Sequence, residues 1–115
     1  MLEIKEKQFL NLKKILFHQL NDEIVTYFLR DFRNYPLFES IQEFSLWLKN
    51  RLEYAFEWEL LDANCICDFI RYSIEFEEIQ SLSLNENIKE IMTYPGRTDE
   101  KKIQALFLYL TKTHN

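Results

Sequence analysis

Apolar residues recur at three- and four-residue spacing along most of the chain, which is the period of one face of a helix. The pattern predicts a helix over residues 5–20. A second helix is expected over 22–33, because Asn21 followed by two acids has the form of an N-cap with acids in the first turn. The repeating apolar positions are Phe9, Leu12, Leu16 and Leu20, then Ile24, Val25, Phe28 and Phe32. Pro36 ends the second pattern, since the residue before proline is disfavoured in the α region.

Four further cap signals divide the rest of the chain. The capping box formed by Ser40 and Glu43 predicts a helix from 41 to about 59, which we expect to be the longest. Asp62 is expected to cap a helix that ends near Phe76 or Ile79. Asn85 and Thr98 are expected to open two more helices, separated by the breaker Tyr94-Pro95-Gly96. The apolar stripes of these helices give the predicted core, of which the central members are Phe44, Leu48, Leu52, Phe69, Ile70 and Phe107.

These elements predict an all-α fold. One Gly and two Pro in 115 residues are too few for the many turns of a sandwich, barrel or doubly wound sheet. No alternation of apolar and polar residues is sustained as in a strand. We therefore expect a single helical domain over 1–115, a bundle of about six helices with helix over more than about 60% of the chain. Its 18 aromatic residues (ten Phe, six Tyr, two Trp) supply enough apolar surface for folding alone or as a small oligomer such as a homodimer.

Charge and composition exclude several classes of function. The net charge is −5, the wrong sign for a protein that neutralises phosphates, so direct nucleic-acid binding is not expected. No uncharged apolar run approaches the roughly 20 residues that span a bilayer. Acids near the N-terminus argue against a cleaved signal peptide. Two closely spaced cysteines without further partners are typical of reduced thiols, and the expected location is cytoplasmic.

No catalytic, metal or cofactor site is expected. Gly96 alone cannot build a phosphate-binding loop or a nucleophile elbow. His18 and His114 are far apart along the chain. Cys65 and Cys67 point about 200° apart on a helix, so they are expected to pack as small side chains, and metal or redox chemistry is the alternative.

The distribution of charge is the least ordinary feature of the sequence. Residues 53–96 hold ten acids and two bases, whereas the segments on either side carry small positive balances. Arg71 lies at helical spacing from several of these acids and is expected to pair locally. Such an acidic segment either steers a basic protein partner or confers solubility.

Two aromatic residues accompany the acidic segment. Tyr54 and Trp58 lie one turn apart, offset from the main apolar stripe. They form either a second packed face, the commoner arrangement for a central helix, or an exposed recognition patch. The candidate partner-binding residues are therefore Tyr54, Glu57, Trp58, Asp68, Glu75 and Glu78.

From 51 to 112 the order of elements resembles a family of small helical proteins from bacterial type VI secretion and toxin gene neighbourhoods. The resemblance rests on Arg51-Leu-Glu-Tyr-Ala55, Leu61-Asp62, Asp68-Phe-Ile-Arg-Tyr72 with Phe76, Ile88 to Met92, and Lys102-Ile103. The family pattern has Tyr-Gly where this chain has Trp58-Glu59. The resemblance implies a cytoplasmic, non-catalytic protein that binds a co-encoded effector or toxin, as immunity protein or loading adaptor. It supplies no catalytic residues.

Two functional hypotheses follow. The first is a protein-binding module whose acidic middle helices and aromatic residues hold a larger protein partner, an effector or toxin. The second is an inhibitor that imitates nucleic acid and presents carboxylates to a nuclease or another nucleic-acid enzyme. An enzyme is not expected, because no nucleophile and base, metal cluster or cofactor loop can be assembled.

Overall fold

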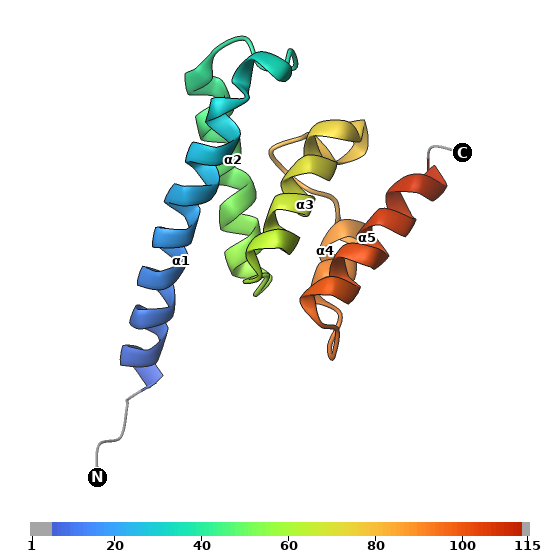
Figure 1. Cartoon of the computed structure of the whole chain (residues 1–115). Coiled ribbons are helices and arrows are strands. Elements are labelled where there is room, and N and C mark those ends of the chain that lie inside the picture. Colours follow the sequence, from blue (N-terminus) through green and yellow to red (C-terminus); the bar gives the residue numbers. More distant parts are fainter. Residues whose placement is uncertain (1–5, 114–115) are drawn as a thin grey trace.

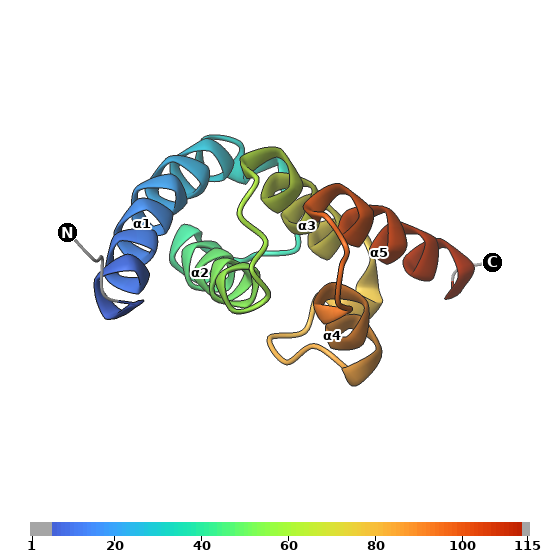
Figure 2. The same ribbon diagram turned by 90° about the horizontal axis from the view of Figure 1, so that it is seen from below.

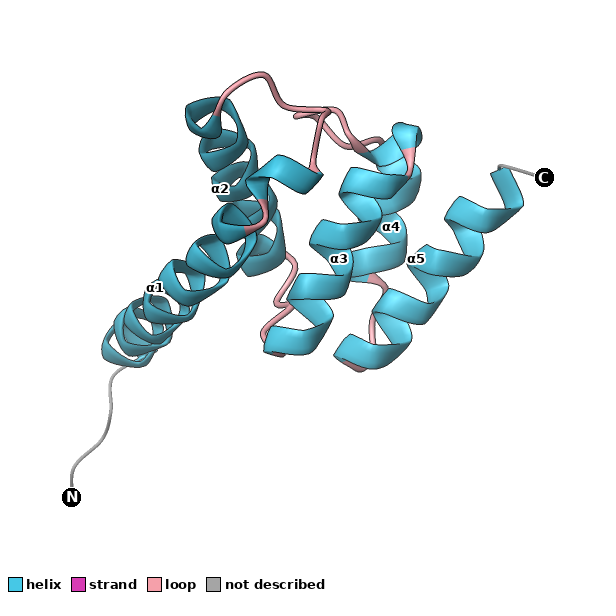
Figure 3. Cartoon of the chain, turned by 45° about the horizontal axis from the view of Figure 1, so that its top comes forward, coloured by secondary structure: helices cyan, strands magenta, loops and turns pink. Residues whose placement is uncertain are grey.

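The structure, a computed structural model, describes residues 6–113, with side chains at 15 and 17–112. Five α-helices follow one another: α1 (Glu6–Arg30), α2 (Ile41–Glu57), α3 (Ala63–Glu75), α4 (Glu86–Thr93) and α5 (Asp99–Thr113) (Figure 1). Two 3-10 turns, η1 (Phe32–Asn34) and η2 (Glu77–Ile79), lie in the connections. The described residues contain no strand (Figure 3). The prediction of an all-α fold is confirmed, and that of about six helices is close.

The helices form two layers. Seen along the bundle, α1, α3 and α5 lie in one row, while α2 and α4 lie against one side of it (Figure 2). The chain measures 55 × 31 × 21 Å along its principal axes, and α1 extends beyond the end of α2 (Figure 1). The core between the layers holds the predicted residues Phe44, Leu48, Leu52, Phe69 and Ile70, none more than 2% exposed. The side chains of Phe9, Leu12 and Leu16, and His114, lie outside the described residues.

The predicted break at Asn21 is wrong. α1 runs through it for 25 residues and is longer than α2, which has 17. The buried Asn21 Oδ1 has no hydrogen-bond partner and caps nothing. Ile24 and Phe28 continue the buried stripe of Phe17 without a change of register, and the sequence has no Gly or Pro before Pro36 to stop the helix.

The four later cap predictions are confirmed. Ser40 Oγ accepts from the Glu43 N–H at 3.1 Å, and the Glu43 carboxylate accepts from the Glu39 N–H at 3.0 Å. The carboxylate of Asp62 accepts from the N–H of Cys65. In the same way Asn85 Oδ1 accepts from Ile88 and Thr98 Oγ1 from Lys101. Each acceptor satisfies an amide that the helix itself leaves free.

A Schellman motif ends α2. The Leu60 N–H donates to the Ala55 carbonyl at 2.8 Å and the Glu59 N–H to the Phe56 carbonyl at 3.1 Å. Glu59 sits at the C′ position with φ of 58°, the left-handed region that glycine adopts without strain.

Phe107 is a second correction. It was expected in the core, yet it is 42% exposed. α5 buries Ile103, Leu106 and Leu110 instead, and Phe107 lies at the flank of that stripe. Its ring packs on Tyr72 of α3, with ring centroids 5.4 Å apart. The contact covers part of the ring and leaves the rest at the surface.

Candidate functional site

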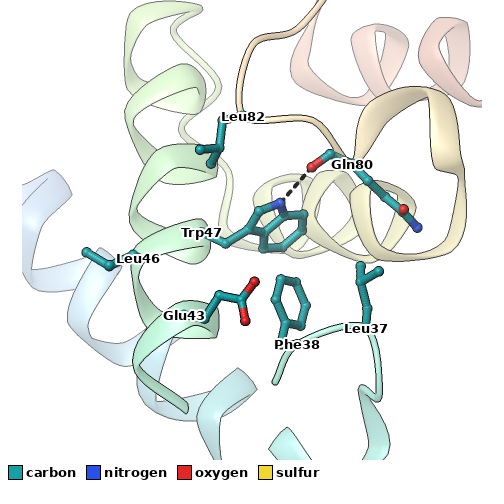
Figure 4. A pocket seen from close by; sticks show the side chains of 7 residues that line it. All are labelled: Leu37, Phe38, Glu43, Leu46, Trp47, Gln80 and Leu82. Carbon is teal, nitrogen blue, oxygen red and sulfur yellow. Dashed lines mark hydrogen bonds between the residues drawn. The ribbon is translucent and has the colours of Figure 1, made fainter. Parts of the chain in front are cut away.

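An apolar groove lies beside the N-terminal half of α2. Its volume is about 380 Å³, at the small end of the range for binding pockets. The walls come from the connection before α2, from α2 itself and from the connection after η2 (Figure 4). The lining residues are Leu37, Phe38, Glu43, Leu46, Trp47, Gln80 and Leu82.

The edge of the groove is formed by exposed leucines. Leu46 is 69% exposed, Leu82 60% and Leu37 46%. Single exposed leucines are ordinary, whereas three around one hollow form an apolar patch of the kind that marks an interaction site. The floor is different, since Phe38 and Trp47 are buried and packed together with ring centroids 5.0 Å apart.

Trp47 connects the floor of the groove to the opposite wall by a hydrogen bond. Its indole Nε1–H donates to the Gln80 carbonyl at 2.9 Å, across 33 residues of sequence (Figure 4). Three rings, those of Phe38, Phe44 and Tyr35, pack in succession behind it, and the Phe38 and Phe44 centroids are 4.6 Å apart. The groove is therefore formed before any ligand arrives, because its floor and walls are fixed by core contacts.

Arg51, one turn after Trp47, fixes the same wall from inside the protein. Its guanidinium is fully buried and donates to the carbonyls of Ile79, at 2.8 Å, of Gln80, at 3.4 Å, and of Ser81. The cation also lies 4.9 Å from the centre of the Trp47 ring. Burial lowers the pKa of Arg51 to about 10, so the group stays charged at neutral pH.

Tyr54 completes the stripe. Its hydroxyl accepts from the Leu84 N–H at 3.3 Å. Trp47, Arg51 and Tyr54, at i, i+4 and i+7 on α2, thus hold the backbone of residues 79–84 by hydrogen bonds. Sequence reasoning missed Arg51. The available signal was its place on the apolar stripe between Leu48 and Ala55.

The groove lies between two segments that carry only acidic charge. Residues 34–48 contain two acids and no base, and residues 72–88 contain four acids and no base. The acids are Glu39, Glu43, Glu75, Glu77, Glu78 and Glu86. The predicted candidates Glu75 and Glu78 therefore belong to one of the segments that border the groove.

The other predicted site residues do not gather at one place. Trp58 is 4% exposed and packs edge-to-face on Phe69, with ring centroids 5.6 Å apart, so it belongs to a second packed face of the helix. Tyr54 is half-buried, and its ring packs at a tilt against that of Trp58, with centroids 5.0 Å apart. Neither ring forms an exposed recognition patch.

Two of the predicted acids lie away from the groove. Asp68 forms an ion pair with Arg71 at 3.2 Å, as expected, and Arg71 also donates to the Tyr27 hydroxyl of α1. Glu57 is exposed at the end of α2 and lines a second, more polar hollow with Arg97 and Lys102.

Lys102, one of the two cations of this second hollow, is engaged in the fold. Lys102 is buried and its Nζ donates to the Trp58 carbonyl at 2.9 Å, which places a positive charge at the C-terminal end of α2. Asp99 accepts from the Leu61 and Asp62 N–H groups at 3.1 and 2.9 Å. These groups join α2, α3 and α5 and are not arranged around a ligand.

Both cysteines pack against the core, Cys65 buried and Cys67 half-buried. Burial, assisted by a hydrogen bond to Asp62, raises the pKa of the Cys65 thiol to about 12, and burial also raises the pKa of Cys67. Neither thiol is activated for nucleophilic attack at neutral pH. Among residues 6–113 no group of three or more His, Cys, Asp or Glu side chains is placed to hold a metal ion.

Comparison with known proteins adds no assignment. The chain matches no family model, no curated protein and no solved structure. None of the described helices combines the length and apolar character needed to cross a membrane.

Proposed function

We propose that this protein is a non-enzymatic protein-binding module. One observation carries the proposal: the preformed apolar groove beside α2, edged by Leu37, Leu46 and Leu82, lies between segments that carry only acids. An apolar patch with a charged surround is typical of a protein interface, in which burial of the apolar centre holds the complex together.

The acids have a separate role in this proposal. Surface charges chiefly govern the rate of encounter, while buried apolar anchors govern how long a complex lasts. The acidic segment 53–96 then attracts a basic partner, and the groove retains it. The partner is a larger protein, and the resemblance of residues 51–112 favours a co-encoded bacterial effector or toxin, bound in the cytoplasm by an immunity protein or a loading adaptor.

The test begins with affinity capture from the native cell, using a tagged copy of the full chain. Association and dissociation rates of the captured partner are then measured across a salt series. The matched variant replaces Glu57, Asp68, Glu75 and Glu78 by lysine. We expect slower association at low salt with little change in melting temperature, because Glu57 and Glu75 are exposed and Asp68 makes only a half-exposed ion pair.

Two outcomes contradict the proposal. Failure of the wild-type chain to capture any specific protein removes the function itself. Unchanged association at low salt shows that the acids only confer solubility. If affinity is instead lost entirely as salt rises, and replacing the groove leucines leaves affinity unchanged, the alternative of a nucleic-acid-mimicking inhibitor is the better description. For a toxin partner, restoration of growth on co-expression distinguishes an immunity protein from an adaptor.

A further inference from the structure

The groove beside α2 restricts what kind of segment can occupy it. Three carbonyls of one wall are already engaged: the Gln80 carbonyl accepts from Trp47 and Arg51, and the Ile79 and Ser81 carbonyls accept from Arg51. The described residues also contain no strand whose edge could pair with an extended peptide. A segment that enters the groove must therefore satisfy its own backbone hydrogen bonds, as a helix does.

Charge restricts the occupant further. The segments 34–48 and 72–88 contain six acids and no base, and Glu43 belongs to the lining of the groove (Figure 4). The buried Arg51 lies behind the wall, and its guanidinium donates to backbone carbonyls. The backbone N–H of Glu39 donates to only one of the two Glu43 carboxylate oxygens, Oε2. A segment that carries lysine or arginine beside its apolar residues is attracted here. A second copy of this chain brings a net charge of −5 and is repelled.

We infer that the groove binds one amphipathic, basic helix of the partner protein. Apolar residues one turn apart on that helix contact Leu82 and Leu37 above the floor of Phe38 and Trp47, and its lysine or arginine residues lie toward the surrounding acids. This inference rests on the proposed function and names the chemistry of the partner at the same site.

The test uses fluorescein-labelled synthetic peptides of about 18 residues, long enough to form a helix. The first peptide has leucine on one helical face and lysine on the other. The second has glutamate in place of lysine, and the third has proline at its centre. Binding to the full chain is followed by fluorescence anisotropy, and the contact surface by NMR shifts of the Trp47 indole and the leucine methyl groups.

A matched pair of variants makes the experiment specific. Leu82→Ser removes a groove leucine, and Leu108→Ser removes a leucine of equal exposure, 60%, on α5. Leu37→Ser is a second groove variant, and circular dichroism verifies that each variant is folded. We expect the lysine peptide to bind about tenfold more weakly to either groove variant and with unchanged affinity to Leu108→Ser. The glutamate and proline peptides should each bind the wild type at least about tenfold more weakly than the lysine peptide does.

Several results overturn the inference. Absence of saturable binding by the lysine peptide does so, as does equal loss in Leu82→Ser and Leu108→Ser. Equal binding of the proline peptide means that the occupant is extended, and equal binding of the glutamate peptide removes the charge argument. A dimer of the protein alone, present in sedimentation and lost in Leu82→Ser, makes a second copy the occupant.

Failure of this inference is distinguishable from failure of the proposed function. If Leu82→Ser captures the same native partner with wild-type yield and dissociation rate, the groove is not the site, although the protein still binds a partner. If the wild type captures no specific protein, the proposed function fails whatever the peptides do.

Discussion

Replacing Arg51 by methionine tests whether a buried cation builds the wall of the groove. The guanidinium donates to three backbone carbonyls between residues 79 and 81. Methionine has a similar length and no charge, so it fills much of the same space without donating a hydrogen bond. The change therefore removes the hydrogen bonds of Arg51 while leaving most of the packing of α2 in place.

The three carbonyls differ in what they lose. The Ile79 bond is buried, so this acceptor stays unsatisfied, at a cost of about 1–3 kcal/mol. The Gln80 carbonyl keeps its hydrogen bond from the Trp47 indole. Ser81 is exposed, so its carbonyl can accept a hydrogen bond from water instead. Loss of the cation over the Trp47 ring adds about 1 kcal/mol or more. Relief from burying a charge, the effect that lowers the pKa of Arg51, offsets part of this sum. We expect a net loss of about 1–3 kcal/mol.

The assay is denaturant unfolding followed by circular dichroism, with Lys49→Met as the control. Lys49 is an exposed base on the same helix, and its replacement should change stability by less than about 0.5 kcal/mol. Hydrogen exchange of the Trp47 indole and the Leu84 amide should accelerate in Arg51→Met by more than the loss of global stability explains. Both protons form hydrogen bonds between α2 and residues 79–84, the segment that Arg51 holds. A variant as stable as the wild type, with unchanged exchange at these two protons, would refute the reasoning.

Three further predictions concern the rest of the fold. Leu48→Ala should cost about 2–5 kcal/mol in denaturant melts, because the side chain is fully buried, whereas Leu108→Ala on the surface should cost little; equal costs would contradict the core assignment. Glu59→Gly should stabilise the protein by about 0.5–1 kcal/mol, measured as a higher melting temperature, because φ is 58° at this exposed position; a lower melting temperature would argue against strain there. Cys65 should react with maleimide far more slowly than Cys67 at pH 8, by mass spectrometry of single-Cys variants. Its raised pKa means that the folded protein holds the thiol proton more tightly than the unfolded chain does, so the stabilisation is complete below about pH 8.5 and is lost as the pH rises toward 12. Between pH 7.5 and 10 the free energy of unfolding should therefore fall more in the wild type than in Cys65→Ser. An equal fall in both proteins would contradict the raised pKa of Cys65.

Local sequence determined where α2, α3, α4 and α5 begin. Ser40, Asp62, Asn85 and Thr98 each accept a hydrogen bond from an amide three residues later. That interaction needs only the side chain and the first turn of its own helix, so the sequence was enough to predict it. Asn21 has the same local pattern and is not a cap. There the unbroken apolar period of α1 packs against α2 and α3, and tertiary burial outweighs the capping preference.

The same limit applies to individual side chains. A helical period identifies an apolar stripe, and it correctly placed Phe44, Leu48 and Leu52 in the core. It cannot tell how many neighbours a helix has. Trp58 is 4% exposed and packs on Phe69 of α3, whereas Phe107 packs on Tyr72 and is still 42% exposed.

The sequence by itself determined an all-α chain with its caps, most of its core and a strongly acidic middle segment, since these follow from composition and from contacts within a few residues. Only the tertiary structure decided where an interaction surface lies. The groove exists because Trp47 and Arg51 of α2 bond to carbonyls 28–33 positions later, which fixes the connection that carries Leu82. Backbone carbonyls occur at every position and leave no mark in the sequence, so the partners of a buried arginine become known only when the helices are packed.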